Sequence, residues 1–138
     1  MSMRGPEVTR WEEKLKQVFD RIDDHLEERY GSDYPLHPAR AKRGAAANRE
    51  DDGLFNVGAA FSAGFGSEHG RGYVVEVRMS TLSDIPEKVR NTFENEVADL
   101  LEKELPAVFP DRHLKVVRDG PVFKIIGDLG LTDPPPIP

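Results

Sequence analysis

The chain has 138 residues, of which 38% are hydrophobic and 32% are charged, and its formal net charge at pH 7 is −6. A chain of this length buries roughly two-thirds of its unfolded surface, so it can fold without disulfides or structural metals. Because it contains no cysteine, thiolate catalysis and thiolate metal sites are excluded, and its acidic balance disfavours general attraction to nucleic acid or anionic lipid.

No stretch of the sequence has the apolar length of a targeting or membrane-spanning segment, which needs about 20 residues to cross a bilayer. We therefore expect a cytoplasmic protein without membrane contact. Residues 1–131 are expected to form a single α+β domain. The proline-rich residues 132–138 are expected to be an extended or disordered tail.

The first predicted element is a helix over residues 7–30. Its apolar residues recur at steps of three and four, the period of one helical face: Trp11, Leu15, Val18, Phe19, Ile22, Leu26 and Tyr30. Pro6 suits the first turn, and Gly31 is expected to end the helix in a left-handed conformation. Residues 32–53 then lack any period, which indicates a functional or disordered loop, and the alanines at 45–47 suggest a short helical turn in it.

Alternating apolar residues predict two strands, over residues 55–66 and 73–80, joined by a turn at 66–72. A second helix is predicted over 85–105, with Asp84 as its N-cap and Pro106 as the residue that prevents its continuation.

A last hairpin pairs residues 113–117 with 122–126. Asp119 and Gly120 are expected in its turn, because both residue types tolerate positive φ. The element order α-β-β-α-β-β predicts an α+β fold: a four-stranded antiparallel sheet with both helices packed on one face.

Residues 58–73 contain five of the twelve glycines, and one face of the predicted strand carries only small residues and Asn56. Glycine weakens strands, so such a face suggests that another surface approaches closely. Four explanations are open: cover by loop 32–53, cover by a second subunit, a ligand, or simply a twisted, bulged hairpin. From this face we expect a homodimer or a related homo-oligomer.

The segment 64–69 fails as a nucleotide loop, because a glycine fingerprint needs glycine where His69 stands and needs a helix to follow. An anion-binding turn remains possible in principle, since backbone N–H groups would lie beside Arg71. Loop 34–49 is cationic, and its arginines suit phosphate or carboxylate; the alternative is that its acidic flanks neutralise it. We predict an anionic small molecule where the two segments meet, with these ligand-binding residues: His37, Arg40, Arg43, Ser67, His69 and Arg71.

The four histidines show no metal-ligand spacing, so we predict no metal and no cofactor, and nucleic-acid binding is disfavoured because only Tyr34 adds an aromatic ring near the basic loop. The leading hypothesis is a non-catalytic ligand- or partner-binding module that uses hairpin 58–73 and loop 34–49. The alternative is a small hydrolase or transferase that acts on a phosphate- or carboxylate-bearing substrate with His69 and Arg71.

Overall fold

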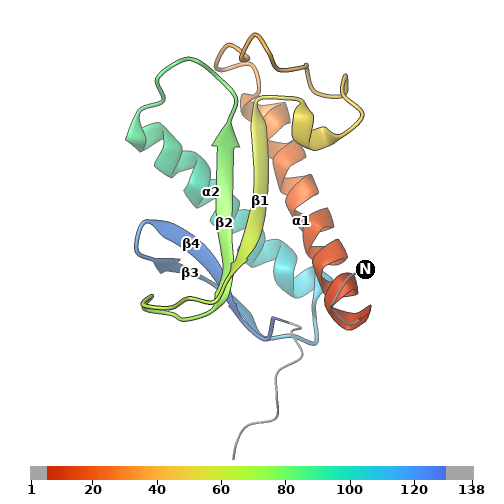
Figure 1. Cartoon of the computed structure of the whole chain (residues 1–138), viewed down its shortest axis with the longest axis vertical. Coiled ribbons are helices and arrows are strands. Elements are labelled where there is room, and N and C mark those ends of the chain that lie inside the picture. The colour runs from red at the N-terminus through yellow and green to blue at the C-terminus, as the bar shows by residue number, and fades with distance from the viewer. Residues whose placement is uncertain (1–5, 130–138) are drawn as a thin grey trace, which may run out of the picture.

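The predicted α+β fold and its element order are confirmed by the computed structural model, which describes residues 6–129 (Figure 1). The elements are α1 (Pro6–Tyr30), a short 3-10 helix η1 (Arg49–Asp51), β1 (Phe55–Ser62), β2 (Gly72–Met79), α2 (Glu87–Val108), β3 (Leu114–Asp119) and β4 (Val122–Gly127). The predicted tail, 132–138, lies outside the described residues.

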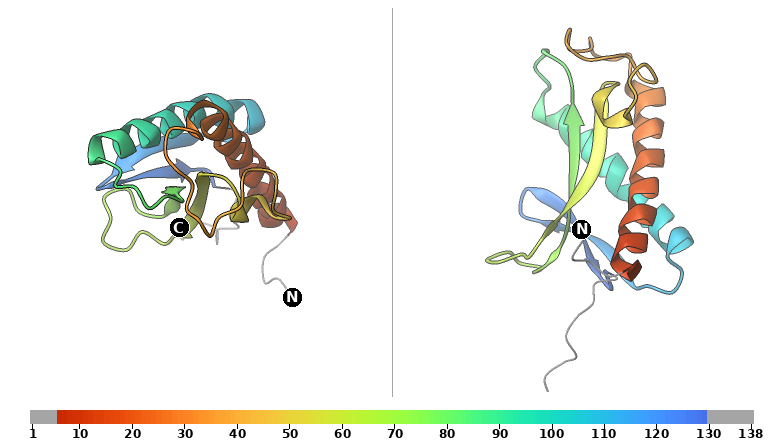
Figure 2. Two further views of the ribbon diagram at one scale, coloured as in Figure 1. Left: turned by 90° about the horizontal axis from the view of Figure 1, so that it is seen from above. Right: turned by 45° about the vertical axis from the view of Figure 1, so that its right-hand side comes forward.

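The four-stranded antiparallel sheet has the order β1-β2-β4-β3, so β1 and β3 are its edges. β1 and β2 pair along all eight residues, and β3 and β4 pair along six. The two hairpins join through only two pairs, Tyr73 with Ile125 and Val74 with Lys124. The sheet is therefore two hairpins that meet over a short contact, and both helices lie on the same side of it (Figure 2).

The core lies between the helices and the sheet. The apolar stripe of α1 is buried as predicted, and α1 packs on β1 and α2, while α2 also packs on β3. The ring of Trp11 lies 4.5 Å from that of Phe109 and 5.9 Å from that of Tyr73, measured between centroids. Burial of each large apolar side chain of this kind contributes about 1.5–3 kcal/mol, which explains why the helical stripe is a reliable signal.

The predicted ends of the helices need correction. α2 begins at Glu87, with Pro86 at the N-cap position and no side-chain cap, so the prediction of Asp84 as N-cap is wrong. Pro106 does not stop α2, because it stands in the last turn, and the Phe109 N–H still bonds to the Leu105 carbonyl at 2.8 Å. Gly31 is not left-handed; its N–H extends the helical ladder to the Glu27 carbonyl.

Two predicted details between the elements are also wrong. β1 ends at Ser62 rather than at residue 66, and Phe65 is not on its apolar face but is 96% exposed. The helical turn expected at residues 45–47 occurs at η1 instead. In both places a contact distant in sequence decides the backbone path, as the site geometry below shows.

Candidate functional site

Loop 31–54 is held on α1 by Arg43. Its guanidinium donates to Asp23 Oδ2 at 2.9 Å, to Asp52 Oδ1 at 3.2 Å and to the Phe55 carbonyl at 2.9 Å. The side chain of Asp52 is 2% exposed. Burial opposes ionisation of Asp52, but the N–H groups of Ala46 and Gly44 and the charge of Arg43 outweigh it and hold its pKa below the usual value.

Two further side chains complete this attachment. Glu27 accepts the backbone N–H groups of Leu54 and Phe55 at 2.9 and 3.0 Å, which ties the start of β1 to α1. Arg40 donates to the carbonyls of Gly53 and Asp52, both at 3.0 Å. Arg40 and Arg43 therefore use their donors to shape the chain itself.

The glycine-rich hairpin folds over a buried lysine. Lys124 is 2% exposed, and its ammonium group donates to Asp119 Oδ2 at 2.8 Å, to the Gly70 carbonyl at 2.8 Å and to Ser67 Oγ at 3.1 Å. The His69 N–H also donates to Asp119 at 3.1 Å. The hydrogen bond from Lys124 is the main cause that lowers the pKa of Asp119.

This closure explains the glycines. Gly64 has a φ of +75°, and a Cβ there would overlap the backbone of Gly70. A Cβ at Gly72 would lie 2.6 Å from the Ile125 carbonyl oxygen. Within residues 6–129, what approaches these glycines is the chain itself. The expectation that Asp119 belongs to the turn is wrong, since it is the buried last residue of β3 and only Gly120 has positive φ there.

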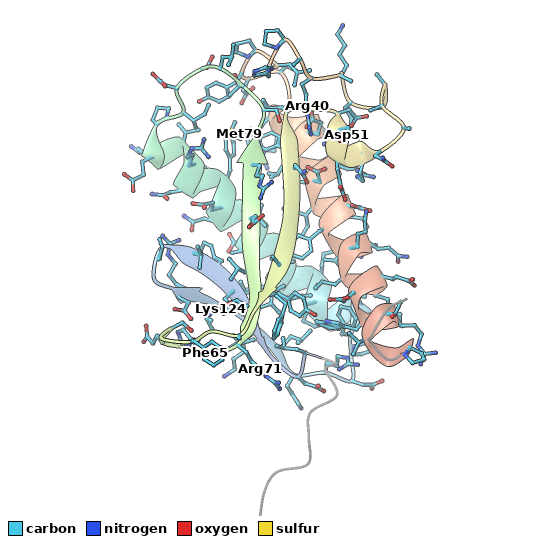
Figure 3. The ribbon with its side chains drawn as sticks, in the orientation of Figure 1. Arg40, Asp51, Phe65, Arg71, Met79 and Lys124 are labelled. Carbon is cyan, nitrogen blue, oxygen red and sulfur yellow. The ribbon has the colours of Figure 1, made fainter. Side chains whose placement is uncertain are left out.

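The six predicted ligand-binding residues form two separate groups. Ser67, His69 and Arg71 lie at the hairpin end of the β1–β2 pair, whereas the other three, His37, Arg40 and Arg43, lie at its opposite end (Figure 3). Eight strand residues separate the ends, a span of roughly 25 Å. The structure does not bring the two groups together, so the expected common anion site is not formed.

Each group has local surroundings of its own. His37 and Arg40 line a shallow hollow of about 310 Å³ with Met79, Ser80 and Thr81. Nδ1 of His37 accepts the Ala39 N–H at 3.0 Å, which makes it part of the loop. Among residues 6–129, no group of three or more histidine or carboxylate side chains is arranged to hold a metal ion.

A deeper groove of about 300 Å³ separates α1 from β1. Hairpin 58–73 and loop 34–49, the two segments chosen from the sequence, meet at this groove: Gly58, Ala59 and Tyr73 line it beside Arg49. Its apolar wall includes Leu15 and Phe19. The remaining lining residues are mostly polar: Glu12, Lys16, Asp20, Asp23, Glu50, Asn56 and Val57.

The polar groups of this groove have distinct environments. The Tyr73 hydroxyl donates to Glu12 Oε2 at 3.1 Å. Asp23 is 4% exposed; Arg43 binds its Oδ2, while its Oδ1 has no hydrogen-bond donor within residues 6–129. Burial raises the pKa of Asp23 to about 6, against the opposing charge of Arg43. The groove lining therefore includes an enclosed carboxylate, one oxygen of which has no donor within residues 6–129.

Sequence reasoning missed Asp23 and Lys124. Asp23 follows the apolar Ile22 on α1 and reads as one more charge on a solvated helix face. Lys124 interrupts the apolar run of β4, and a lone lysine inside such a run was the available signal of a buried ion pair.

The edge of β1 beside the groove is unpaired. β1 pairs with β2 on one side only, and within the described residues Asn56–Ser62 make no backbone hydrogen bond outside that ladder. A Cβ at Gly58 would meet no atom within 4 Å. Backbone donors and acceptors of an edge strand can pair with another chain.

The fold and this groove define a small α+β protein, and comparison with known proteins shows its family. The chain belongs to a family described as "Uncharacterised protein", whose model matches residues 6–127. It is similar to an "Uncharacterized protein" of Borreliella burgdorferi (strain ATCC 35210 / DSM 4680 / CIP 102532 / B31), with 38% identity over 106 residues that cover 77% of this chain and 83% of the relative. No solved structure matches it. Within residues 6–129, neither helix has the length and apolar character needed to cross a membrane.

Proposed function

We propose that this protein is a non-catalytic binding module for another protein and that the groove between α1 and β1 is its binding site. The observation that supports this most is the position of the groove, between a mostly charged face of α1 that includes Leu15 and Phe19 and an unpaired strand edge. Hairpin 58–73 and loop 34–49 both contribute to it, through Gly58 and Arg49. Grooves of this construction bind partner chains through backbone pairing and side-chain pockets together.

The alternative of a small hydrolase or transferase has less support. Catalysis needs groups poised around one reacting atom. Ser67 Oγ is instead engaged with Lys124 and the Gly64 carbonyl, and His69 contributes its backbone N–H to Asp119. An anionic small molecule is likewise less supported, because Arg40 and Arg43 bind groups of their own chain.

The test is a selection of random displayed peptides on the immobilised protein, followed by NMR mapping of the selected peptides. We expect a shared peptide pattern and shifts confined to groove residues. Ala59→Trp should abolish binding, since Ala59 lines the groove and shares with Val57 the strand face that is turned to α1. The matched control is Ala60→Trp, on the same strand but outside the groove lining. The proposal fails if no peptide is selected, or if both variants bind equally well.

Homodimerisation is a separate proposal, supported by the small residues on the outer face of β1, where Ala60 is exposed. Ala60→Arg would place a charged side chain against such a contact. Light scattering should then show a dimer for the natural chain and a monomer for the variant; a monomeric natural chain contradicts the proposal.

A further inference from the structure

We infer that the segment bound in the groove is an extended, basic stretch of a partner protein that pairs with the free edge of β1. This inference rests on the proposed function and adds the conformation and charge of the partner. It follows from three independent features of the groove: the unpaired backbone, the charge of the lining and the unpartnered buried oxygen of Asp23.

The backbone of β1 selects an extended ligand. Residues 56–59 of β1 form one wall of the groove, a length of roughly 13 Å, and β2 occupies only their other edge. An extended segment added at this edge would satisfy the free N–H and carbonyl groups as a fifth strand. Gly58 and Ala59 present little side chain, which permits a close approach of the second backbone.

The opposite wall of the groove, formed by α1, favours a ligand whose apolar side chains stand at alternate positions. Leu15 and Phe19 lie one turn apart on α1 and line the groove with Val57. Successive side chains of an extended segment point to opposite faces, so every second residue would face these apolar groups. The ligand therefore needs apolar residues at alternate positions.

The charge of the lining selects a basic ligand. Four acidic side chains line the groove, Glu12, Asp20, Asp23 and Glu50, against two basic ones, Lys16 and Arg49. Lys16 and Arg49 already pair with Asp20 and Asp24, and Arg43 binds Asp23. Glu50 is exposed and has no ion pair within the described residues, so a lysine or arginine of the partner would pair with it. The enclosed Oδ1 of Asp23, which has no donor within residues 6–129, adds negative potential behind this lining.

The same charges disfavour a second copy as the occupant. The β1 sequence, FNVGAAFS, contains no basic residue. Pairing two β1 edges would place two acid-rich grooves next to each other without a counter-charge. A basic partner segment meets both the backbone and the charge requirements.

The test uses three peptides and the full chain labelled with ¹⁵N. The first peptide alternates lysine and valine, the second alternates glutamate and valine, and the third is the first with N-methylated backbone on alternate residues. We expect the lysine peptide to bind with shifts at residues 56–59 and slowed exchange of the amides of Val57 and Ala59, which face the free edge. The glutamate and N-methylated peptides should each bind at least about tenfold more weakly, the scale of losing charge-assisted or backbone hydrogen bonds.

Variants locate the charge. Asp23→Asn and Glu50→Gln should each weaken the lysine peptide several-fold, and Asp99→Asn on the exposed side of α2 should not. Glu50→Gln remains informative if Asp23→Asn destabilises the chain, since Glu50 is exposed.

The outcomes separate this inference from the proposed function. Equal groove binding of the lysine and glutamate peptides overturns the basic partner, and undiminished binding of the N-methylated peptide overturns strand pairing; both leave the binding module intact. If the display selection returns groove-binding peptides of another pattern while the lysine peptide does not bind, only this inference fails. If neither yields a groove binder, both proposals fail.

Discussion

The two ends of the β1–β2 pair are each closed by a cation, the buried Lys124 and the partly buried Arg43, but the two closures differ in how fully their partners are matched. At the hairpin end, the three N–H donors of Lys124 meet three acceptors, with Asp119 as the one carboxylate. At the loop end, Arg43 faces three carboxylates, those of Asp23, Glu27 and Asp52. One oxygen of Asp23 remains without a donor there, in the lining of the groove.

This difference teaches that a buried charge indicates function only when its matching is incomplete. The Lys124 closure accounts for every polar atom that it buries, so it explains the hairpin and requires no ligand. The Arg43 closure docks the loop and leaves three buried side-chain atoms without hydrogen-bond partners in the described part of the chain: Asp23 Oδ1 in the lining of the groove, and the Nε donors of Arg43 and Arg49. Substitutions that remove Lys124 or Arg43 break each closure in turn.

The largest effect is expected from Lys124→Met. Removing the lysine leaves the Asp119 carboxylate buried without its cation, which should cost about 3–5 kcal/mol of unfolding free energy. Urea denaturation measures the loss, and amide exchange should accelerate across residues 63–71. The double variant Lys124→Met with Asp119→Leu removes both charges and should recover at least half of the loss. A loss below about 1 kcal/mol for the single variant would show that the closure is not stabilising.

Arg43→Met should cost somewhat less, about 2–3 kcal/mol, because Arg43 itself is 22% exposed and its acids keep other hydrogen bonds. Amide exchange in residues 40–53 should accelerate, while the hairpin end should be unaffected. The neighbouring Lys42→Met is the control, since Lys42 is exposed and should change stability by less than about 0.5 kcal/mol. Equal effects of the two variants would contradict the docking role of Arg43.

The unpartnered acid predicts a pH dependence. Because burial raises the folded-state pKa of Asp23 to about 6, the folded state holds its proton more tightly than the unfolded state does. The associated stability is present below about pH 4 and is lost as pH rises through 6, by about 3 kcal/mol. Asp52 and Asp119 have lowered pKa values and act in the opposite direction only at lower pH.

Urea titrations from pH 4.5 to 7 test this dependence. Asp23→Asn should flatten the profile, whatever it costs in absolute stability through the loss of its pairs with Arg43 and Arg49. Glu27, which also faces Arg43, is the control position: in Glu27→Gln the slope should persist. A natural chain whose stability does not fall across this range would refute a raised pKa of Asp23.

The smallest expected effect is the difference in stability between alanine variants of two hairpin glycines. Both glycines have a positive φ, +75° at Gly64 and +77° at Gly66. Alanine at Gly66 meets open space, so it should cost only the backbone strain of about 1–2 kcal/mol. Alanine at Gly64 also overlaps Gly70, so it should cost about 1 kcal/mol more. Melting curves measure both; equal losses would mean that the close approach at Gly64 is relaxed in solution.

Much of the fold could be predicted because it depends on local periodicity. The three- and four-residue apolar steps from Trp11 to Tyr30 and the two-residue steps from Phe55 report which face of each element is buried, and burial dominates folding. The element ends were predicted less well. The prediction for Asp84 follows a capping preference of about 1 kcal/mol and that for Pro106 a helix-interior cost of about 3 kcal/mol, both of which tertiary contacts can override.

The candidate site depended on tertiary structure. The sequence by itself determined the order of elements and the apolar faces, and it singled out segments 34–49 and 58–73 as the parts of the proposed site. Two ion pairs decided which parts of these segments meet: Arg43 with Asp23 and Lys124 with Asp119. Their residues are 20 and 5 positions apart in the sequence. The strength of such a pair depends on desolvation and distance in the folded state, quantities that no periodicity encodes. Only the folded chain therefore separates arginines that bind their own loop from an acid that keeps an oxygen without a donor within residues 6–129.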